Sequence, residues 1–321
     1  MKYDVVTLGE TMIRLSPPGK QRIEQAVSLE LRIGGAESNV AVDLARLGLR
    51  TAWVSRLVDN PLGRRIASEI RAHGVDTSHL IWTQDGRVGT YFVEFGAPPR
   101  PIRVWYDRAD SAMARLSPEE IDWQVFGESR LVHLTGITVA LSASCSQVVS
   151  LLVDRAREAG VTVSFDVNYR AKLWPPELAA EALSPICGKT DILFVGSHDA
   201  ARLFACQGPP EQMADQLRGM FGARIIALTK ADGGSVCLDD NGIYSEGPYP
   251  AVAEVDRVGA GDAFASGFLF GYLEGKDPAL CLRYARALSA IKYSMPGDLA
   301  ITTREELESL VSRPPQEGIQ R

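Results

Sequence analysis

The stretch VDRVGAGDAFASGFLFGYLEG, residues 255–275, places glycines and an aspartate at the start of a predicted helix. The first backbone N–H groups of a helix have no internal partner, and the aligned peptide dipoles add about half a positive charge there. Glycines before the helix let the backbone approach an anion without a Cβ in the way. Gly259, Ala260 and Gly261 therefore predict a pocket for an anion.

Asp262 lies in the first turn of the same helix, and we expect the neighbouring amides to hold its carboxylate ionised. Because like charges repel, this carboxylate is better placed to take a proton from a hydroxyl group that attacks the anion, as phosphoryl transfer requires. Gly267 and Gly271, four residues apart, are interpreted as positions where the helix packs tightly on a sheet. An ordinary glycine-rich loop before a helix is the alternative interpretation.

The composition indicates a packed globular chain. Of the 321 residues, 45% are hydrophobic and 23% are charged, which fits one large α/β domain with an extra lobe, or two domains. The formal net charge of −6 argues against a general binder of nucleic acid or of an anionic membrane. Five scattered cysteines without a C-x-x-C pair, no long apolar run and no evident signal peptide lead us to expect a cytoplasmic protein.

Apolar runs alternate with helical patterns along most of the chain. The predicted strands are 4–10, 51–58, 130–136, 161–168, 191–196 and 224–230. The predicted helices include 36–48, 62–74, 146–160 and a helix pair between residues 196 and 224. This alternation predicts a parallel sheet covered on both faces, with ligands at the carboxyl ends of its strands.

Two segments, 12–33 and 88–108, contain no helical pattern and look like β-hairpins with Pro/Gly turns. We expect them to pair as a small sheet, a lid on the main domain, with two separate surface hairpins as the alternative. The predicted organisation is an α/β domain (1–11, 34–87 and 109–312), the lid (12–33 and 88–108) and a disordered tail (313–321). Thr303 and Glu306 predict a capping box at the last helix.

The segments GGAESNVAVDLARLG (34–48) and DRVGAGDAFASGF (256–268) resemble the two signature regions of the ribokinase-like (PfkB-type) sugar kinases. The resemblance runs from about residue 3 to 310. It implies a ribokinase-like three-layer α/β/α domain with a mostly parallel sheet and a β lid, and ATP and Mg²⁺ as cofactors. It also implies that Asp262 is the catalytic base, and that the backbone at Gly259, Ala260 and Gly261 stabilises the transferring phosphoryl group.

The same resemblance implies two sets of binding residues. Those expected to contact the sugar are Gly34, Gly35, Ala36, Glu37, Ser38, Asn39, Tyr91, Tyr106, Arg108, Arg170 and Asp262. Those expected to contact ATP are Asn168, Arg170, Ser197, Thr229, Lys230, Ala231, Asp232, Gly233, Gly234, Gly259 and Gly261.

The substrate is indicated by VWYDRADSA (104–112) and FDVNYRAKLW (165–174), which supply Arg108 and Arg170. The planar arginine fork suits a carboxylate or a phosphate. The pattern resembles the 2-keto-3-deoxygluconate kinases, which produce 2-keto-3-deoxy-6-phosphogluconate. Fructokinases share much of it, so a fructokinase or another PfkB-type sugar kinase stays open. A nucleoside kinase and a non-catalytic sugar- or nucleotide-binding protein are further alternatives.

Metal ligands are less well marked. Many relatives carry N-x-x-E after the fifth strand, whereas this chain has Gly196 and Asp199, so we expect Asp199 to hold Mg²⁺ through water. Asp256, Val258 and the segment 294–298 correspond to a monovalent-cation loop in some relatives, which makes a monovalent cation a further expected ligand. Exposed lid strands predict a homo-oligomer that pairs through its lids.

Overall fold

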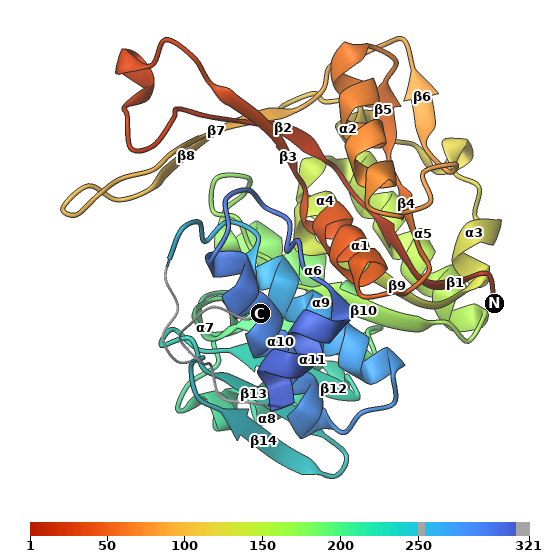
Figure 1. Cartoon of the computed structure of the whole chain (residues 1–321). Coiled ribbons are helices and arrows are strands. Elements are labelled where there is room, and N and C mark those ends of the chain that lie inside the picture. The colour runs from red at the N-terminus through yellow and green to blue at the C-terminus, as the bar shows by residue number, and fades with distance from the viewer. Residues whose placement is uncertain (250–253, 313–321) are drawn as a thin grey trace.

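The computed structural model describes residues 1–249 and 254–312 (Figure 1). Its main feature is an eight-stranded sheet in the order β14-β13-β12-β11-β10-β9-β1-β4. The strands are β1 (Tyr3–Leu8), β4 (Thr51–Val54), β9 (Ser129–Thr135), β10 (Thr162–Asp166), β11 (Ile192–Gly196), β12 (Ile225–Thr229), β13 (Ser235–Asp239) and β14 (Gly242–Glu246). Six neighbouring strands of this sheet run parallel, namely β4, β1, β9, β10, β11 and β12. The remaining two strands, β13 and β14, are added as antiparallel pairs. The predicted mostly parallel sheet is confirmed.

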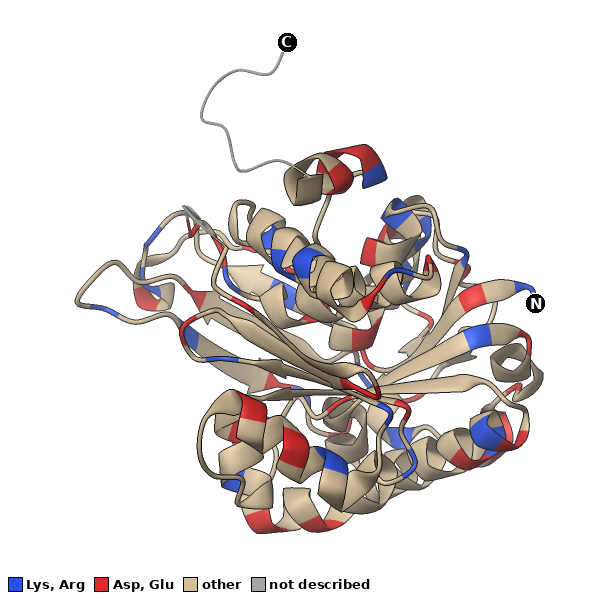
Figure 2. Ribbon diagram, turned by 90° about the horizontal axis from the view of Figure 1, so that it is seen from below, with Lys and Arg blue, Asp and Glu red and all other residues tan. Residues whose placement is uncertain are grey.

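Helices cover both faces of the sheet, which Figure 2 shows edge-on between two helical layers. One face packs against α1 (Ala36–Arg46), α9 (Ala260–Leu273), α10 (Pro278–Tyr293) and α11 (Arg304–Ser312). The other packs against α3 (Gln124–Gly127), α5 (Ala143–Glu158), α6 (Pro176–Cys187), α7 (Ser197–Phe204) and α8 (Pro210–Phe221). Neighbouring residues on a strand, such as Val5 and Val6 of β1, enter opposite layers. The three-layer α/β/α architecture is confirmed.

The predicted strand 51–58 is divided in two. After β4 the chain leaves the main sheet at Ser55, whose carbonyl accepts from the N–H of Ile81. The segment β5 (Arg56–Val58) then pairs with β6 (Ile81–Thr83) in a separate two-stranded sheet beside α2 (Pro61–Ala72). This side sheet does not reach the cavity described below.

The two glycines inside α9 contact a helix, not the sheet, so this part of the prediction is wrong. A Cβ atom at Gly267 would lie 2.4 Å from the carbonyl oxygen of Tyr284, and one at Gly271 would lie 3.0 Å from Sγ of Cys281. Both neighbours belong to α10. The glycines therefore allow α9 and α10 to pack closely against each other.

The two helix-poor segments form one four-stranded lid sheet, as predicted. The hairpin β2 (Met12–Ser16) and β3 (Glu30–Gly34) joins the hairpin β7 (Thr90–Glu94) and β8 (Arg103–Asp107) through the parallel pair β2 and β7. A short 3₁₀ turn, Ile23–Gln25, interrupts a segment that was predicted to contain no helix. The lid projects from the main body (Figure 1), and the domain boundaries themselves stay a prediction.

The last helix has half of its predicted capping box. Thr303 Oγ1 accepts from the backbone N–H of Glu306 at 3.2 Å, but the Glu306 carboxylate accepts from the hydroxyl of Thr302 instead of returning to Thr303. The tail 313–321, predicted to be disordered, lies outside the described residues. Within residues 1–249 and 254–312, no helix has the length and apolar character needed to cross a membrane.

Candidate active site

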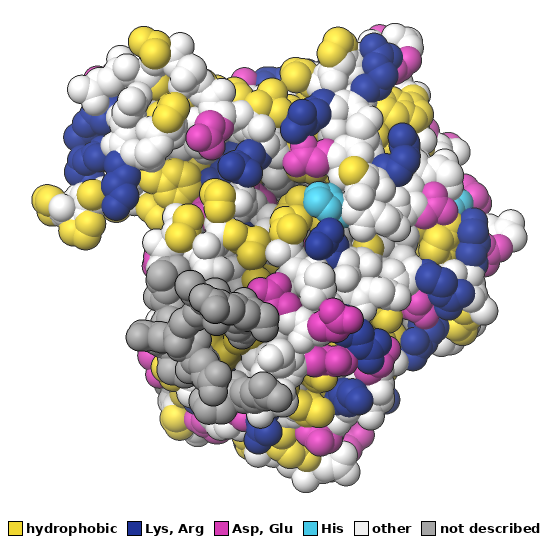
Figure 3. Space-filling model, in the orientation of Figure 1, with side chains coloured by type: hydrophobic (Ala, Val, Ile, Leu, Met, Phe, Trp, Pro, Cys, Tyr) yellow, Lys and Arg dark blue, Asp and Glu magenta, His cyan; other side chains and the backbone are white. Residues whose placement is uncertain are grey.

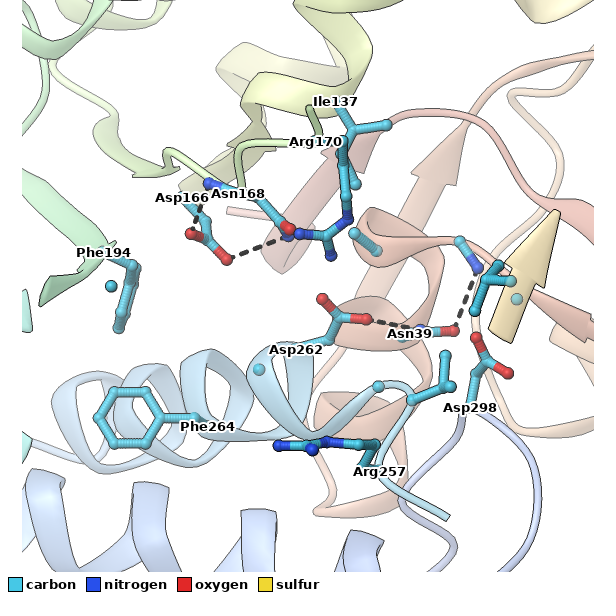
Figure 4. Close-up of a pocket in the computed structure, with 18 of the residues that line it drawn as sticks. Asn39, Ile137, Asp166, Asn168, Arg170, Phe194, Arg257, Asp262, Phe264 and Asp298 are labelled. Atoms are coloured by element: carbon cyan, nitrogen blue, oxygen red, sulfur yellow. Dashed lines mark hydrogen bonds between the residues drawn. The ribbon is translucent and has the colours of Figure 1, made fainter. Parts of the chain in front are cut away.

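A cavity of about 400 Å³ lies at the carboxyl ends of the central strands, where the lid meets the main body, and Figure 4 draws residues that line it. Figure 3 shows hydrophobic side chains gathered where the projecting lid joins the main body. The structure brings together here many of the residues predicted from the two motifs and from the strand ends. These are Gly34, Gly35, Ala36, Asn39, Tyr91, Tyr106, Arg108, Asn168, Arg170, Asp199, Thr229, Gly259, Gly261 and Asp262.

The N-terminus of α9 opens into this cavity. Gly259 has φ +87°, and a Cβ atom there would lie 2.0 Å from the carbonyl oxygen of Asp298, so both its conformation and its surroundings require glycine. The N–H of Ala260 is already donated to the carbonyl of Arg257 at 3.3 Å. In the described part of the chain, the N–H groups of Gly259 and Gly261 have no acceptor. These two amides, together with the helix dipole, are free to receive an anion, and the pocket predicted from the sequence stays a prediction.

Asp262 lies beside those amides and is 8% exposed. Its Oδ2 accepts from Nδ2 of Asn39 at 2.7 Å (Figure 4). Burial raises the pKa of Asp262 to about 6, although the hydrogen bond from Asn39 and the charge of Arg170 lower it. Burial is thus the largest influence on this pKa, and the lowering groups are the side chains of Asn39 and Arg170. A carboxyl with a pKa near 6 is still mostly ionised at neutral pH and suits a general base.

Asp166 is a site residue that the sequence analysis did not single out. It ends β10 and accepts from the backbone N–H and from Nδ2 of Asn168, at 3.1 and 3.2 Å. Asn168 has φ 41°, a left-handed conformation that asparagine tolerates better than most residues. Burial raises the pKa of Asp166 to about 8, with a further increase from Asp262 and a decrease from Arg170. The available signal was the D-x-N-x-R pattern at a strand end.

Asp166, Asp199 and Asp262 all line the cavity. Burial raises the pKa of each, and like-charge repulsion adds to this effect for Asp166 and Asp262. Among the described residues, no three carboxylate, histidine or cysteine side chains lie close enough to hold a metal ion together. One or two carboxylates are still enough for Mg²⁺, which keeps several waters and also binds the phosphates of a nucleotide. Asp166 and Asp199 are the residues that would hold the ion.

Arg108 is held by a carboxylate at the end of β1. Its Nε and Nη2 donate to Oε2 of Glu10 at 2.8 and 2.5 Å, and both side chains are buried. The guanidinium lies 5.7 Å from the ring centroid of Tyr106. Glu10 therefore fixes the direction of Arg108 and offsets part of its charge. Glu10 received no role from the sequence, because its partner lies 98 residues away.

The lid contacts the main body through Tyr91. Its hydroxyl donates to Oδ2 of Asp298 at 2.6 Å, and its ring stacks on Tyr106 with centroids 6.1 Å apart. A Cβ atom at Gly34 would lie 2.2 Å from the Tyr91 hydroxyl oxygen. The first glycine of the Gly-Gly motif thus leaves room for the lid tyrosine.

Glu37 and Ser38 do not line the cavity. The carboxylate of Glu37 accepts from the hydroxyls of Thr135 and Thr138 at 2.7 and 2.6 Å, beneath the carboxyl ends of the strands. The hydroxyl of Ser38 donates to the carbonyl of Gly35 at 2.9 Å. Both side chains support the Gly-Gly turn from behind.

A second cavity of about 260 Å³ adjoins the first at Phe264, which lines both. Ala231, Asp232 and Gly233 line it from the turn after β12, opposite Tyr293 of α10. Its size and aromatic walls suit a purine ring. Among the other residues predicted for the nucleotide, the ammonium of Lys230 contacts Ser245 and Glu211, and Ser197 and Gly234 line neither cavity.

Arg257 is a further residue to which the sequence gave no role. It occupies a variable position of the D-x-x-G-A-G-D motif, lines the main cavity and is exposed. In the described residues no carboxylate forms an ion pair with it, whereas Arg108 is paired. In Figure 4 its side chain extends from the start of α9 toward Phe264. It is thus a cation placed between the anion pocket and the second cavity.

Comparisons with known proteins agree with this geometry. The sequence model described as pfkB family carbohydrate kinase matches residues 2–314. The chain is 40% identical over 311 residues to a 2-dehydro-3-deoxygalactonokinase of Haloferax volcanii, covering 97% of each. It is 32% identical over 317 residues to a 2-dehydro-3-deoxygluconokinase of Bacillus subtilis, covering 97% of this chain and 96% of the relative. The crystal structure of a 2-dehydro-3-deoxygluconokinase from Thermotoga maritima superposes with a TM-score of 0.91 at 34% identity, covering 97% of this chain and all of that one.

Proposed function

Because this chain belongs to the pfkB family of carbohydrate kinases, we propose that it transfers a phosphoryl group from ATP to the terminal hydroxyl of a 2-keto-3-deoxy sugar acid. The first candidate substrate is 2-keto-3-deoxygluconate, which would give 2-keto-3-deoxy-6-phosphogluconate. The second is its C4 epimer, 2-keto-3-deoxygalactonate, which the name of the 40% identical relative favours.

The observation that carries the proposal is the buried Asp262 beside the free amides of Gly259 and Gly261. In the proposed reaction the substrate hydroxyl gives its proton to Asp262. Its oxygen forms a bond to the γ-phosphorus of ATP, the bond to the β-phosphate oxygen breaks, and ADP leaves. The two amides stabilise charge on the oxygens of the transferred group.

A carboxylate on the substrate would meet Arg108 and Arg170, which line the same cavity from the lid side and from the end of β10. A guanidinium that is oriented before binding loses less freedom when it pairs with a ligand. Glu10 orients Arg108 in this way. A neutral ketose lacks the carboxylate, so the two arginines favour a sugar acid over fructose.

ATP would extend from the anion pocket into the second cavity, with its purine near Phe264 and Gly233. Asp166 and Asp199 would hold Mg²⁺, which neutralises charge on the phosphates. The exposed guanidinium of Arg257 lies along this route and would contact the phosphate chain.

We also propose that two copies pair through their lids. Leu31, Leu15, Phe92 and Trp105 are directly opposite one another across the four strands, and all four are partly exposed. An apolar row across a sheet face is unusual on a monomer's surface and suits a second copy of the same face. The five cysteines are free and buried, in keeping with the expected cytoplasmic location.

An assay of ADP release tests the proposed function, with 2-keto-3-deoxygluconate, 2-keto-3-deoxygalactonate, fructose, ribose and adenosine as acceptors. We expect kcat/KM for a keto acid to exceed that for fructose by at least about 100-fold, since a polar site discriminates strongly against a ligand that leaves it unpaired. Fructose as the best acceptor would make the protein a fructokinase. ATP binding without turnover of any acceptor would favour the non-catalytic alternative.

A further inference from the structure

Two buried cations lie between the loop that precedes α9 and the loop that follows α10. Lys292 of α10 is 0% exposed, and its Nζ donates to the backbone carbonyls of Asp256 and Met295 at 3.0 and 3.1 Å. Arg14 of the lid strand β2 donates from Nη2 to Oδ2 of Asp256 and from Nη1 to Oδ1 of Asp298, both at 2.6 Å. These loops contain the residues that correspond to a monovalent-cation loop in some relatives.

The carboxylate oxygens of these loops that could coordinate a monovalent cation already have partners. Oδ1 of Asp256 accepts from the N–H of Val258, and its Oδ2 also accepts from the N–H of Gly297, each at 3.0 Å. Oδ2 of Asp298 accepts from the hydroxyl of Tyr91. The carboxylates of Asp256 and Asp298 are balanced by the two cations. Burial raises the pKa of Asp43, a third carboxyl group that interacts with Lys292, well above its usual value, so a further buried charge would be costly. The residues present therefore do not fit a bound potassium or sodium ion.

We propose that the ammonium of Lys292, together with the guanidinium of Arg14, takes the place of a dissociable monovalent cation, so that the enzyme works without one. This inference rests on the proposed kinase function. An ammonium carries the same single positive charge as a potassium ion, and its N–H groups can donate to the carbonyl oxygens that would otherwise coordinate the ion. Burial lowers the pKa of Lys292, and the carboxylates of Asp256 and Asp298 oppose that effect.

The hydrogen bonds of Lys292 connect it to the backbone on both sides of the anion pocket. The carbonyl that it holds belongs to Asp256, three residues before Gly259. The carbonyl of Met295 lies in the same loop as Asp298, whose own carbonyl oxygen would lie 2.0 Å from a Cβ at Gly259. Lys292 is therefore a positioning residue that fixes both sides of the pocket. Loss of its charge should lower kcat, because the free amides move, and should leave the KM for the sugar acid nearly unchanged.

The test is a series of assays at constant ionic strength in potassium, sodium, ammonium and choline chloride, with Tris salts of ATP. For the unmodified protein we expect kcat to vary by less than about twofold across the series. For Lys292→Met we expect kcat in choline to fall by about tenfold or more, the lower part of the range for a misplaced catalytic group. Potassium or ammonium should restore part of that loss. Lys276→Met, an exposed lysine at the turn before α10, is the matched control and should match the unmodified protein.

Activation of the unmodified protein several-fold by potassium would overturn the proposal while leaving the kinase function intact. A Lys292→Met enzyme that is fully active in choline would overturn it as well. Should the variant not fold, the unmodified protein still decides the question, because its kcat and its melting temperature must both be independent of potassium. Absence of ADP release with every acceptor in every salt would instead refute the proposed function.

Discussion

Asn39 of α1 donates a hydrogen bond of 2.7 Å from Nδ2 to Oδ2 of Asp262, at the start of α9, across 223 residues of sequence. This contact joins the two signature motifs of the chain at the reacting end of the cavity. It fixes the orientation of the carboxylate, and it opposes the effect of burial on the pKa of Asp262. Asn39 therefore controls both where the carboxylate of Asp262, the proposed base, points and at which pH it is ionised.

Replacement of Asp262 by asparagine should remove the base and keep the shape of the cavity. We expect kcat to fall by about 10²- to 10⁴-fold, the usual contribution of general base catalysis, with little change in the affinity for the sugar acid. Steady-state kinetics and calorimetric titration of the variant measure the two quantities. A kcat close to that of the unmodified enzyme would show that another group takes the proton.

The pH dependence follows from the raised pKa of Asp262. The base is active when deprotonated, so kcat/KM should fall about tenfold per unit as the pH drops below about 6. Because the hydrogen bond from Asn39 lowers this pKa, Asn39→Ala should move the acidic limb to higher pH. Ser38→Ala, a neighbour that does not line the cavity, should leave the limb in place. An unchanged limb in Asn39→Ala would contradict the assignment.

Arg108→Ala and Arg170→Ala should each weaken the use of a keto acid more than that of a neutral ketose. A charge-assisted hydrogen bond contributes about 1.5–3 kcal/mol, so kcat/KM for the acid should fall roughly 10- to 100-fold more than for fructose. The ratio of the two substrates is the measurement, since a folding defect affects both alike. Equal losses on both substrates would argue against recognition of a carboxylate.

Arg257→Ala should weaken the use of ATP. Loss of a charged contact to the phosphates should lower kcat/KM for ATP by about 10- to 100-fold, and Arg257→Lys should retain part of it. Arg283→Ala, an exposed arginine outside both cavities, is the control and should have normal kinetics. If the two alanine variants behave alike, Arg257 does not contact the nucleotide.

Trp105→Lys tests the pairing of lids. Trp105 is 39% exposed in the apolar row, and Trp82, 42% exposed on β6, lies outside the lid sheet. We expect light scattering to give twice the chain mass for the unmodified protein and for Trp82→Lys, and a single chain mass for Trp105→Lys. A monomeric unmodified protein would remove the proposal.

Strong local patterns made most of the fold predictable. Six parallel strands were found because each is an apolar run, buried on both faces. The two antiparallel strands β13 and β14 were missed. The apolar run of β13 is only three residues long, 236–238, and the edge strand β14 (Gly242–Glu246) has no buried residue. The role of Gly267 was misassigned for a different reason. Its spacing from Gly271 indicates that one side of the helix has no side chains, but it does not indicate which neighbouring element packs there.

The residues of the candidate site likewise fall into two groups: those that a local motif predicts and those that depend on distant parts of the chain. Asp262 was found because its motif is contiguous, and the helix dipole explains its place. Its pKa could not be predicted from the motif, because burial in the folded protein has the largest effect on it. Glu10 and Asp298 matter through partners that lie far away in sequence, and no local pattern marks such pairs.

The position of Arg14 has a consequence for biosynthesis. This cation emerges near the beginning of translation, but its carboxylate partners follow 242 and 284 residues later. At about 5–20 residues per second, the ribosome leaves it without them for roughly 15 to 60 s. Until then the first hairpin cannot bury its guanidinium at low cost, so it must remain undocked. The lid strand β2 of a nascent chain therefore cannot dock on the main domain before almost all of the polypeptide has been made.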